Sequence, residues 1–266
     1  MRASRWMPVA LALSAAFVAS GSSASGKAGA SGGGGAKGKA AAAKPWCAPE
    51  VKELADHVCY FDGGPTEDGR HTLVVYLHGL LADTPGFQYL QQRGMAIHAK
   101  RQHFTVLLPT SPRMDANAFA WPTGRAAQAE HEAKVLAGIK AQKSHLERVM
   151  NTRFDETFVV GFSSGAYYGS SVAMRGLLDV DGFMVLAGGS TWARKNEGQR
   201  RVPIFVGVSA ADAQTAEDSR ALAATLGAMG WPYRVEERNA GHMVDWTFMD
   251  HGLAWLRSQT HARQAR

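Results

Sequence analysis

The sequence contains the three residue types that together perform acyl transfer. They occur in the order serine, aspartate and histidine. Ser163 stands in the segment 161–165, GFSSG, and Asp212 and His242 follow it in the chain. A serine hydroxyl is a poor nucleophile until a neighbouring base takes its proton. Histidine is the usual base, and a carboxylate holds its ring in the required tautomer. These residues therefore predict a nucleophile, a base and an orienting acid.

The surroundings of Ser163 distinguish it from a chance match to G-x-S-x-G. The same pattern occurs around Ser31, in a segment with no predicted strand or helix. Ser163 instead lies between a β-rich run and a helix-like run, where a nucleophile elbow turns sharply and strains the backbone of its serine. Strand and helix approach closely at such a turn. Positions two residues away must therefore be small, and Gly161 and Gly165 meet that need.

The partners of Ser163 are expected just after later strands. Asp212 follows the predicted strand 204–208, whereas the segment 187–190, AGGS, offers no carboxylate after the preceding strand. Asp218 is the alternative acid, although it falls on a predicted helix. For Asp212 the alternative is a purely structural role as a turn or N-cap residue. His242 lies in a turn between the last strand and the last helix, which suits a base.

Acyl transfer also needs hydrogen-bond donors for the oxyanion of the tetrahedral intermediate. Residues 78–81, HGLL, directly follow the predicted strand 72–77. Gly79 allows this loop to turn a backbone N–H toward the nucleophile. We expect the N–H groups of Leu80 and Ser164 to form the oxyanion hole, and His78 to brace the loop rather than act as a base.

Strands and helices alternate after residue 44, which favours a parallel sheet with helices on both faces. The carboxyl ends of such strands share one edge of the sheet, where sites of this class lie. The expected strands are 59–61, 72–77, 104–108, 157–160, 182–186, 204–208 and 233–237, and the expected helices are 50–58, 87–98, 126–150, 164–175, 215–229 and 243–257.

The motifs LHGLL and GFSSG, the post-strand aspartate and the late Gly-His pair resemble the α/β-hydrolase superfamily over about residues 60–258. The similarity is greatest to small, lid-poor serine esterases of the dienelactone hydrolase, carboxylesterase and polyhydroxybutyrate-depolymerase types. It implies an α/β-hydrolase fold, a mostly parallel twisted sheet with helices on both faces and no large cap domain. It also implies a triad of Ser163, Asp212 and His242. The chain departs from many small esterases in having Ser164 where they carry Gln, Met or His.

The first 44 residues predict export followed by a linker. Arg2 and Arg5 precede the apolar run 7–19, which has the length of a signal-peptide core, so residues 1–20 are interpreted as a signal peptide. An uncleaved anchor is the alternative. Residues 21–44 are rich in Gly, Ala, Ser and Lys and are expected to be a disordered linker. Residues 45–266 form the predicted hydrolase domain, in the periplasm or outside the cell.

The net charge of +6 comes from the N-terminal segment. Residues 1–44 hold six of the 29 basic residues and no acidic one, so the remaining chain has 23 basic and 23 acidic residues. The domain therefore carries no charge signal for nucleic acid. The lysines of the linker are either solvated or in weak contact with an anionic envelope surface.

Two cysteines, Cys47 and Cys59, begin the predicted domain. In an oxidising compartment they are expected to form a disulfide worth roughly 3 kcal/mol. Two thiols without nearby histidines make a poor metal cage, and no metal or cofactor signature is present.

The substrate is expected to be a small or polymeric carboxylic ester in an open site. Only about 15 residues separate the strands 182–186 and 204–208, too few for a cap domain. Phe119, Trp121 and Trp192 are expected near the active edge, where they line a groove or simply pack. A serine peptidase or amidase, an acyltransferase and a non-catalytic envelope binding protein are the alternatives.

The disulfide gives the first testable prediction. Reduction should raise the intact mass of the chain by two hydrogen atoms, because each sulfur gains one electron and one proton from the reductant and solvent. Mass spectrometry before and after reduction measures this difference, and an unchanged mass would exclude the bond.

Overall fold

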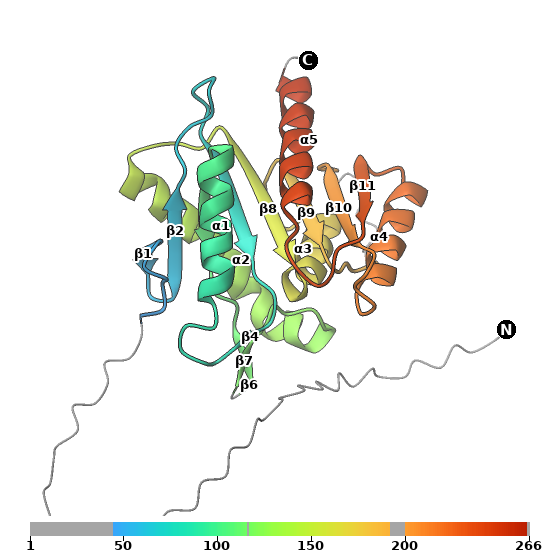
Figure 1. Ribbon diagram of the computed structural model, residues 1–266, viewed down its shortest axis with the longest axis horizontal. Helices are drawn as coiled ribbons and strands as arrows, with labels where there is room; N and C mark the ends of the chain where they lie inside the picture. Colours follow the sequence, from blue (N-terminus) through green and yellow to red (C-terminus); the bar gives the residue numbers. More distant parts are fainter. Residues whose placement is uncertain (1–44, 116, 192–199, 265–266) are drawn as a thin grey trace, which may run out of the picture. The chain divides into compact units, whose positions relative to one another are not determined.

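The computed structural model describes residues 45–115, 117–191 and 200–264 of the chain (Figure 1). The predicted signal peptide and linker, and Trp192, lie outside the described residues. The helices are α1 (Tyr89–Gln102), α2 (Arg125–Met150), α3 (Ser164–Arg175), α4 (Ala216–Ala228) and α5 (Trp246–Gln264). The strands of the large sheet are β1 (Lys52–Ala55), β2 (Val58–Asp62), β3 (Thr72–Leu77), β5 (Thr105–Leu108), β8 (Glu156–Phe162), β9 (Gly182–Leu186), β10 (Ile204–Ser209) and β11 (Tyr233–Arg238).

Within the described residues these eight strands form one sheet in the order β1-β2-β5-β3-β8-β9-β10-β11. From β5 to β11 the neighbouring strands are parallel, whereas β2 is antiparallel to both β1 and β5. Helices α1 and α5 cover one face, and α2, α3 and α4 cover the other. The predicted α/β class, a mostly parallel sheet with helices on both faces, is confirmed.

Strand β3 illustrates why the central strands appear in the sequence as continuous apolar runs. Leu73 and Val75 face the cluster that contains the α3 and α4 side chains, and Val74 and Tyr76 face the cluster that contains those of α1 and α5. A strand covered on both faces needs apolar residues at every position. The predicted bounds of 72–77, 164–175 and 182–186 match the observed elements.

The predicted helix 50–58 is wrong. Residues Lys52–Ala55 form the edge strand β1, which pairs with β2 through Lys52 opposite Tyr60 and Glu53 opposite Cys59. Most β1 side chains are exposed, so the strand lacks the alternating apolar pattern that would identify it. Its charged residues are typical of a protected sheet edge.

A second, three-stranded antiparallel sheet was not predicted. It consists of β4 (Leu81–Ala82), β6 (Arg113–Asp115) and β7 (Ala118–Phe119), in the order β4-β7-β6. Strands of two or three residues are too short to show a period in the sequence. This sheet joins the loop after β3 to the segment after β5, both beyond the carboxyl edge of the large sheet.

The predicted disulfide between Cys47 and Cys59 is present. It attaches the start of the domain to β2. Gln88, the N-cap residue of α1, and Gln92 of α1 bind the same segment, because Gln88 Nε2 donates to Trp46 O at 2.6 Å and Gln92 Oε1 accepts the Ala48 N–H at 2.7 Å. The N-terminal segment, β2 and α1 are therefore fixed to one another.

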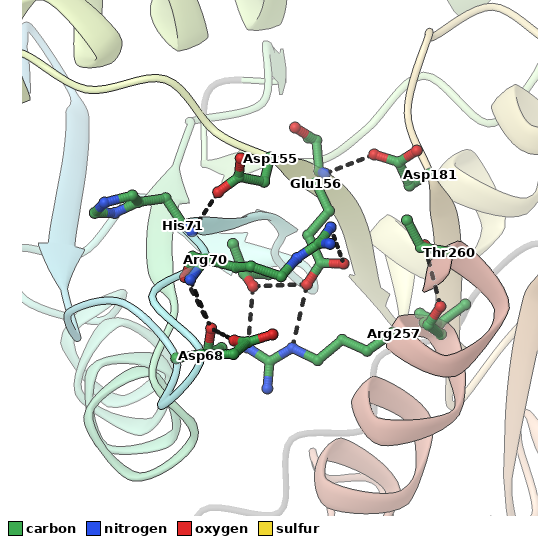
Figure 2. Close-up of polar contacts among 12 residues, drawn as sticks. Asp68, Arg70, His71, Asp155, Glu156, Asp181, Arg257 and Thr260 are labelled. Atoms are coloured by element: carbon green, nitrogen blue, oxygen red, sulfur yellow. Dashed lines mark hydrogen bonds and ion pairs between the residues drawn. The ribbon is translucent and has the colours of Figure 1, made fainter. Parts of the chain in front are cut away.

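A buried ionic network lies at the amino ends of the central parallel strands, opposite the carboxyl edge of the sheet (Figure 2). Glu156 at the start of β8 has a side chain only 1% exposed, and it lies 3.6 Å from Arg70 and 3.3 Å from Arg257 of α5. Its Oε1 also accepts the Thr72 hydroxyl at 2.7 Å. Arg257 donates further to the backbone carbonyl of Gln102 at the end of α1. The network joins β3, β8, α1 and α5.

Among the described residues, none of the helices combines the length and the apolar character needed to cross a membrane.

Glu156→Gln should lower the free energy of unfolding by about 3 kcal/mol, because it leaves two partly buried guanidinium groups without their carboxylate. Urea denaturation measures this change. The control is Arg153→Gln, which removes an ion pair with Glu147 whose arginine is 89% exposed and should cost less than about 1 kcal/mol. Equal effects of the two substitutions would contradict a buried, stabilising network.

Candidate active site

Ser163 occupies a strained turn between β8 and α3. Its φ of 51° and ψ of −118° are unusual for a residue other than glycine, as the elbow motif predicts. A Cβ at Gly161 would lie 2.3 Å from Gly165 O, and one at Gly165 would lie 1.9 Å from Leu77 O. Both positions therefore require glycine, and the turn directs the serine to the carboxyl edge of the sheet.

The structure brings Ser163, His242 and Asp212 into one hydrogen-bonded row. His242 Nε2 lies 3.0 Å from Ser163 Oγ, and His242 Nδ1 lies 2.6 Å from Asp212 Oδ2. Asp212 follows β10 and His242 follows β11, so neighbouring parallel strands deliver them to the same edge. The Asp212 side chain is 4% exposed and that of His242 is 40% exposed. The row thus runs from a buried carboxylate to an accessible hydroxyl.

Asp212 is held as a carboxylate by several donors. Burial by itself raises the pKa of Asp212, but hydrogen bonds from the Thr215 hydroxyl, His242 and the Gln214 N–H outweigh it and hold the pKa below its ordinary value. An ionised Asp212 keeps the proton of His242 on Nδ1, which leaves Nε2 free to accept one. The role of Thr215 was not predicted, although a hydroxyl three residues after the acid was visible in the sequence.

Asp218, the alternative acid, is not part of this row. It lies on α4 as predicted, and its Oδ2 accepts the hydroxyl of Tyr167 at 2.5 Å. The contact with His242 is made by Asp212 instead.

The loop after β3 lies directly beside Ser163. A Cβ at Gly79 would be 3.4 Å from Ser163 Cβ. Within the described part of the chain, the N–H groups of Leu80 and Ser164 donate no hydrogen bond. Ser164 also begins α3, whose N-terminus favours negative charge. Both N–H groups suggested by the sequence are therefore available to an anionic oxygen near Ser163.

The two ring nitrogens of His78 stabilise this loop by hydrogen bonds. Its Nδ1 lies 2.5 Å from Gly79 O, and its Nε2 lies 3.1 Å from the Ser111 N–H. These partners suit the neutral ring, in which Nδ1 donates and Nε2 accepts. Burial lowers the pKa of His78 to about 4, even though the contact with Gly79 O opposes this shift. Neutral His78 has no nitrogen left for proton transfer at Ser163.

Trp121 and Phe119 are packing residues rather than walls of an exposed groove, because they are 2% and 5% exposed. Trp121 has a second role that was not predicted. Its indole Nε1 donates to His78 O at 2.9 Å, and its backbone N–H donates to Ser164 Oγ at 3.1 Å. It therefore connects the loop after β3 to the start of α3.

No group of three His, Cys, Asp or Glu side chains that could hold a metal ion occurs in the part of the chain that the structure describes.

No protein-family model matches the chain, and no curated protein sequence matches it. Solved structures do resemble it in fold. The Bacillus cereus carboxylesterase has a TM-score of 0.56 and 13% sequence identity, and the match covers 76% of this chain and 93% of that one. The Mesorhizobium loti carboxylesterase has a TM-score of 0.55 and 14% identity, with 75% and 93% covered. A variant of Arabidopsis thaliana SOBER1 has a TM-score of 0.51 and 19% identity, with 71% and 99% covered. The predicted α/β-hydrolase fold is confirmed.

Two buried histidines should make the protein less stable in acid. Burial lowers the pKa of His78 to about 4, and burial together with Arg101 lowers that of His98 to about 4, from an ordinary 6.5. Between pH 4 and pH 6.5 these two histidines are protonated in the unfolded chain but neutral in the folded chain. Their contribution to stability is therefore complete above pH 6.5 and is lost as the pH falls toward 4.

His98→Met should reduce the dependence of the unfolding free energy on pH by up to about 1.4 kcal/mol per pH unit. Urea denaturation between pH 4 and pH 7 measures it. His261→Gln, at an exposed position of α5, is the control and should retain the wild-type slope. An unchanged slope in His98→Met would contradict a buried neutral His98.

Proposed function

We propose that this protein is a serine hydrolase that cleaves a carboxylic ester through an acyl-enzyme. The row of Ser163, His242 and Asp212, with contacts of 3.0 and 2.6 Å, carries the proposal. These are the contacts by which a base activates a serine and a carboxylate orients the base. The α/β-hydrolase fold supports it, because that fold places such a row at the carboxyl edge of its sheet.

The mechanism follows from the geometry. His242 Nε2 takes the proton of Ser163 as Oγ attacks the ester carbonyl, and Asp212 stabilises the imidazolium that forms. The Leu80 and Ser164 N–H groups donate to the oxyanion. His242 then returns the proton to the leaving alkoxide, and an acyl-enzyme remains. A water molecule, deprotonated by His242, attacks this acyl-enzyme and releases the acid and free Ser163.

Apolar side chains at the site favour an ester with an apolar acyl or alcohol group. Leu80, in the oxyanion loop, is 41% exposed, and Met243, next to His242, is 51% exposed. A peptidase or amidase and an acyltransferase would use the same acyl-enzyme, so rates on matched ester, thioester and amide substrates separate these activities. A non-catalytic envelope binding protein is disfavoured, because all three triad positions carry reactive residues.

Export to the periplasm or to the medium is the proposed localisation. The apolar run 7–19 after two arginines supports it, as does the Cys47–Cys59 disulfide, because such bonds persist mainly in oxidising compartments. Weak contact between the lysine-containing linker and an anionic surface stays a prediction.

Ser163→Ala should reduce turnover of a short-chain p-nitrophenyl ester by about four to six orders of magnitude. The substitution removes only the hydroxyl oxygen, so the fold should be unchanged. Spectrophotometric release of p-nitrophenol measures the rate.

Ser31→Ala is the matched control, because Ser31 occupies the second G-x-S-x-G pattern. It should hydrolyse the ester at the wild-type rate. A fluorophosphonate probe should label wild type and Ser31→Ala but not Ser163→Ala. Equal turnover by wild type and Ser163→Ala would refute the assignment, and folded wild type that takes no label would favour a binding protein.

A further inference from the structure

The side chain of Gln91, on α1, reaches the back of the loop that carries Leu80. Its Oε1 accepts two hydrogen bonds, from the Gly79 N–H at 3.0 Å and from the Tyr76 hydroxyl at 2.9 Å. Gly79 N–H can only donate, so it fixes the amide of Gln91 with its oxygen toward the loop. Tyr76, 1% exposed at the end of β3, donates to the same oxygen.

Two carbonyl groups of this loop are also bonded inside the protein. His78 O accepts from Trp121 Nε1 at 2.9 Å and from the Gly165 N–H at 3.1 Å. Gly79 O accepts from His78 Nδ1. In a trans peptide the C=O and the following N–H point in opposite directions. Holding Gly79 O against His78 therefore directs the Leu80 N–H away from His78.

Gly79 makes this loop dependent on an external anchor. A Cβ at this position would lie 3.0 Å from the Phe162 ring and 3.4 Å from Ser163 Cβ, so a larger residue would require the Phe162 side chain to shift. Glycine is also the residue whose backbone rotates most freely. Without Gln91, the His78–Gly79 peptide is held only through His78 O, so it can tilt about that side and carry the Leu80 N–H out of line.

The surroundings of Gln91 strengthen its contact with the loop. Tyr76, His78, Gln88 and Gln91 line a cavity of about 20 Å³ behind the loop, which is room for about one water molecule. Few water molecules therefore fit beside the Gln91 side chain, which limits competition for the Gly79 N–H. Burial raises the pKa of Tyr76, so its hydroxyl stays protonated and donates.

We propose that Gln91 is a positioning residue of the oxyanion hole. It holds the His78–Gly79 peptide so that the Leu80 N–H, together with that of Ser164, meets the oxyanion of the substrate. This role rests on the proposed esterase function. It acts through Gly79, so Gln91 itself touches no substrate atom.

The test compares binding of an oxyanion with binding of the ester. A short-chain alkyl trifluoromethyl ketone is the probe: Ser163 Oγ bonds to its carbonyl carbon, the carbonyl electron pair moves to oxygen, and the serine proton passes to His242. Gln91→Met keeps the length of the side chain and removes the acceptor. We expect it to raise Ki for the ketone, and to lower kcat for the p-nitrophenyl ester, by about 10- to 100-fold. KM should stay within about threefold of wild type, since the ground-state ester makes little use of the aligned oxyanion hole.

Gln92→Leu is the matched control on the same helix. Gln92 bonds the N-terminal segment at Ala48 and Trp46 and makes no hydrogen bond with the described residues of the loop. Its substitution should lower Tm while Ki and kcat keep their wild-type values below the transition. Thermal melts of both variants separate lost stability from lost alignment.

Tyr76→Phe provides a second variant that leaves the Gln91 amide in place. It should shift Ki and kcat in the same direction by a smaller factor, and it decides the outcome if Gln91→Met does not fold. If Gln91→Met folds and keeps the wild-type Ki, the positioning role is overturned. If Gln91→Met does not fold, a wild-type Ki in Tyr76→Phe overturns it. A wild type that neither cleaves the ester nor binds the ketone would instead refute the proposed function.

Discussion

The close contact between strand β8 and helix α3 is the constraint on which the candidate site depends. Side chains at positions 161 and 165 would collide with backbone atoms, so the chain makes this turn only with glycine. The turn leaves Ser163 in a strained conformation with φ of 51°, which costs about 1–3 kcal/mol. The buried packing of β8 and α3 offsets that cost. In return the Ser163 hydroxyl and the Ser164 N–H are held at the carboxyl edge of the sheet.

Buried hydrogen bonds fix the other two parts of the site to this turn. Asp212 is held by donors from its own turn, and it in turn holds the ring of His242. The loop after β3 is held by Ser111, Trp121 and Gln91, which come from three different segments. Groups aligned in this way need little reorganisation when charge develops on a reacting oxygen.

The two edges of the sheet have different physical roles. At the amino edge, Glu156 and Arg257 join strands and helices through buried charges that are largely shielded from water. At the carboxyl edge, His242 remains 40% exposed and the backbone of Ser163 is strained. The reactive groups therefore sit on a rigid framework but stay accessible. The disulfide, Gln88 and Gln92 extend this framework to the N-terminal segment.

The sequence by itself determined the central strands, helix α3 and the identity of the three residues in the row. Strands buried on both faces must be apolar throughout, and the turn at Ser163 must have glycines at fixed positions, so both leave local patterns. Only the tertiary structure decided that Lys52–Ala55 is a strand, because exposed edge residues carry no apolar period. It alone also decided that Trp121 is buried and that Gln91 reaches Gly79. These features depend on residues far apart in the sequence. The packing of strands and helices decides which of them meet, and no local sequence pattern specifies that packing.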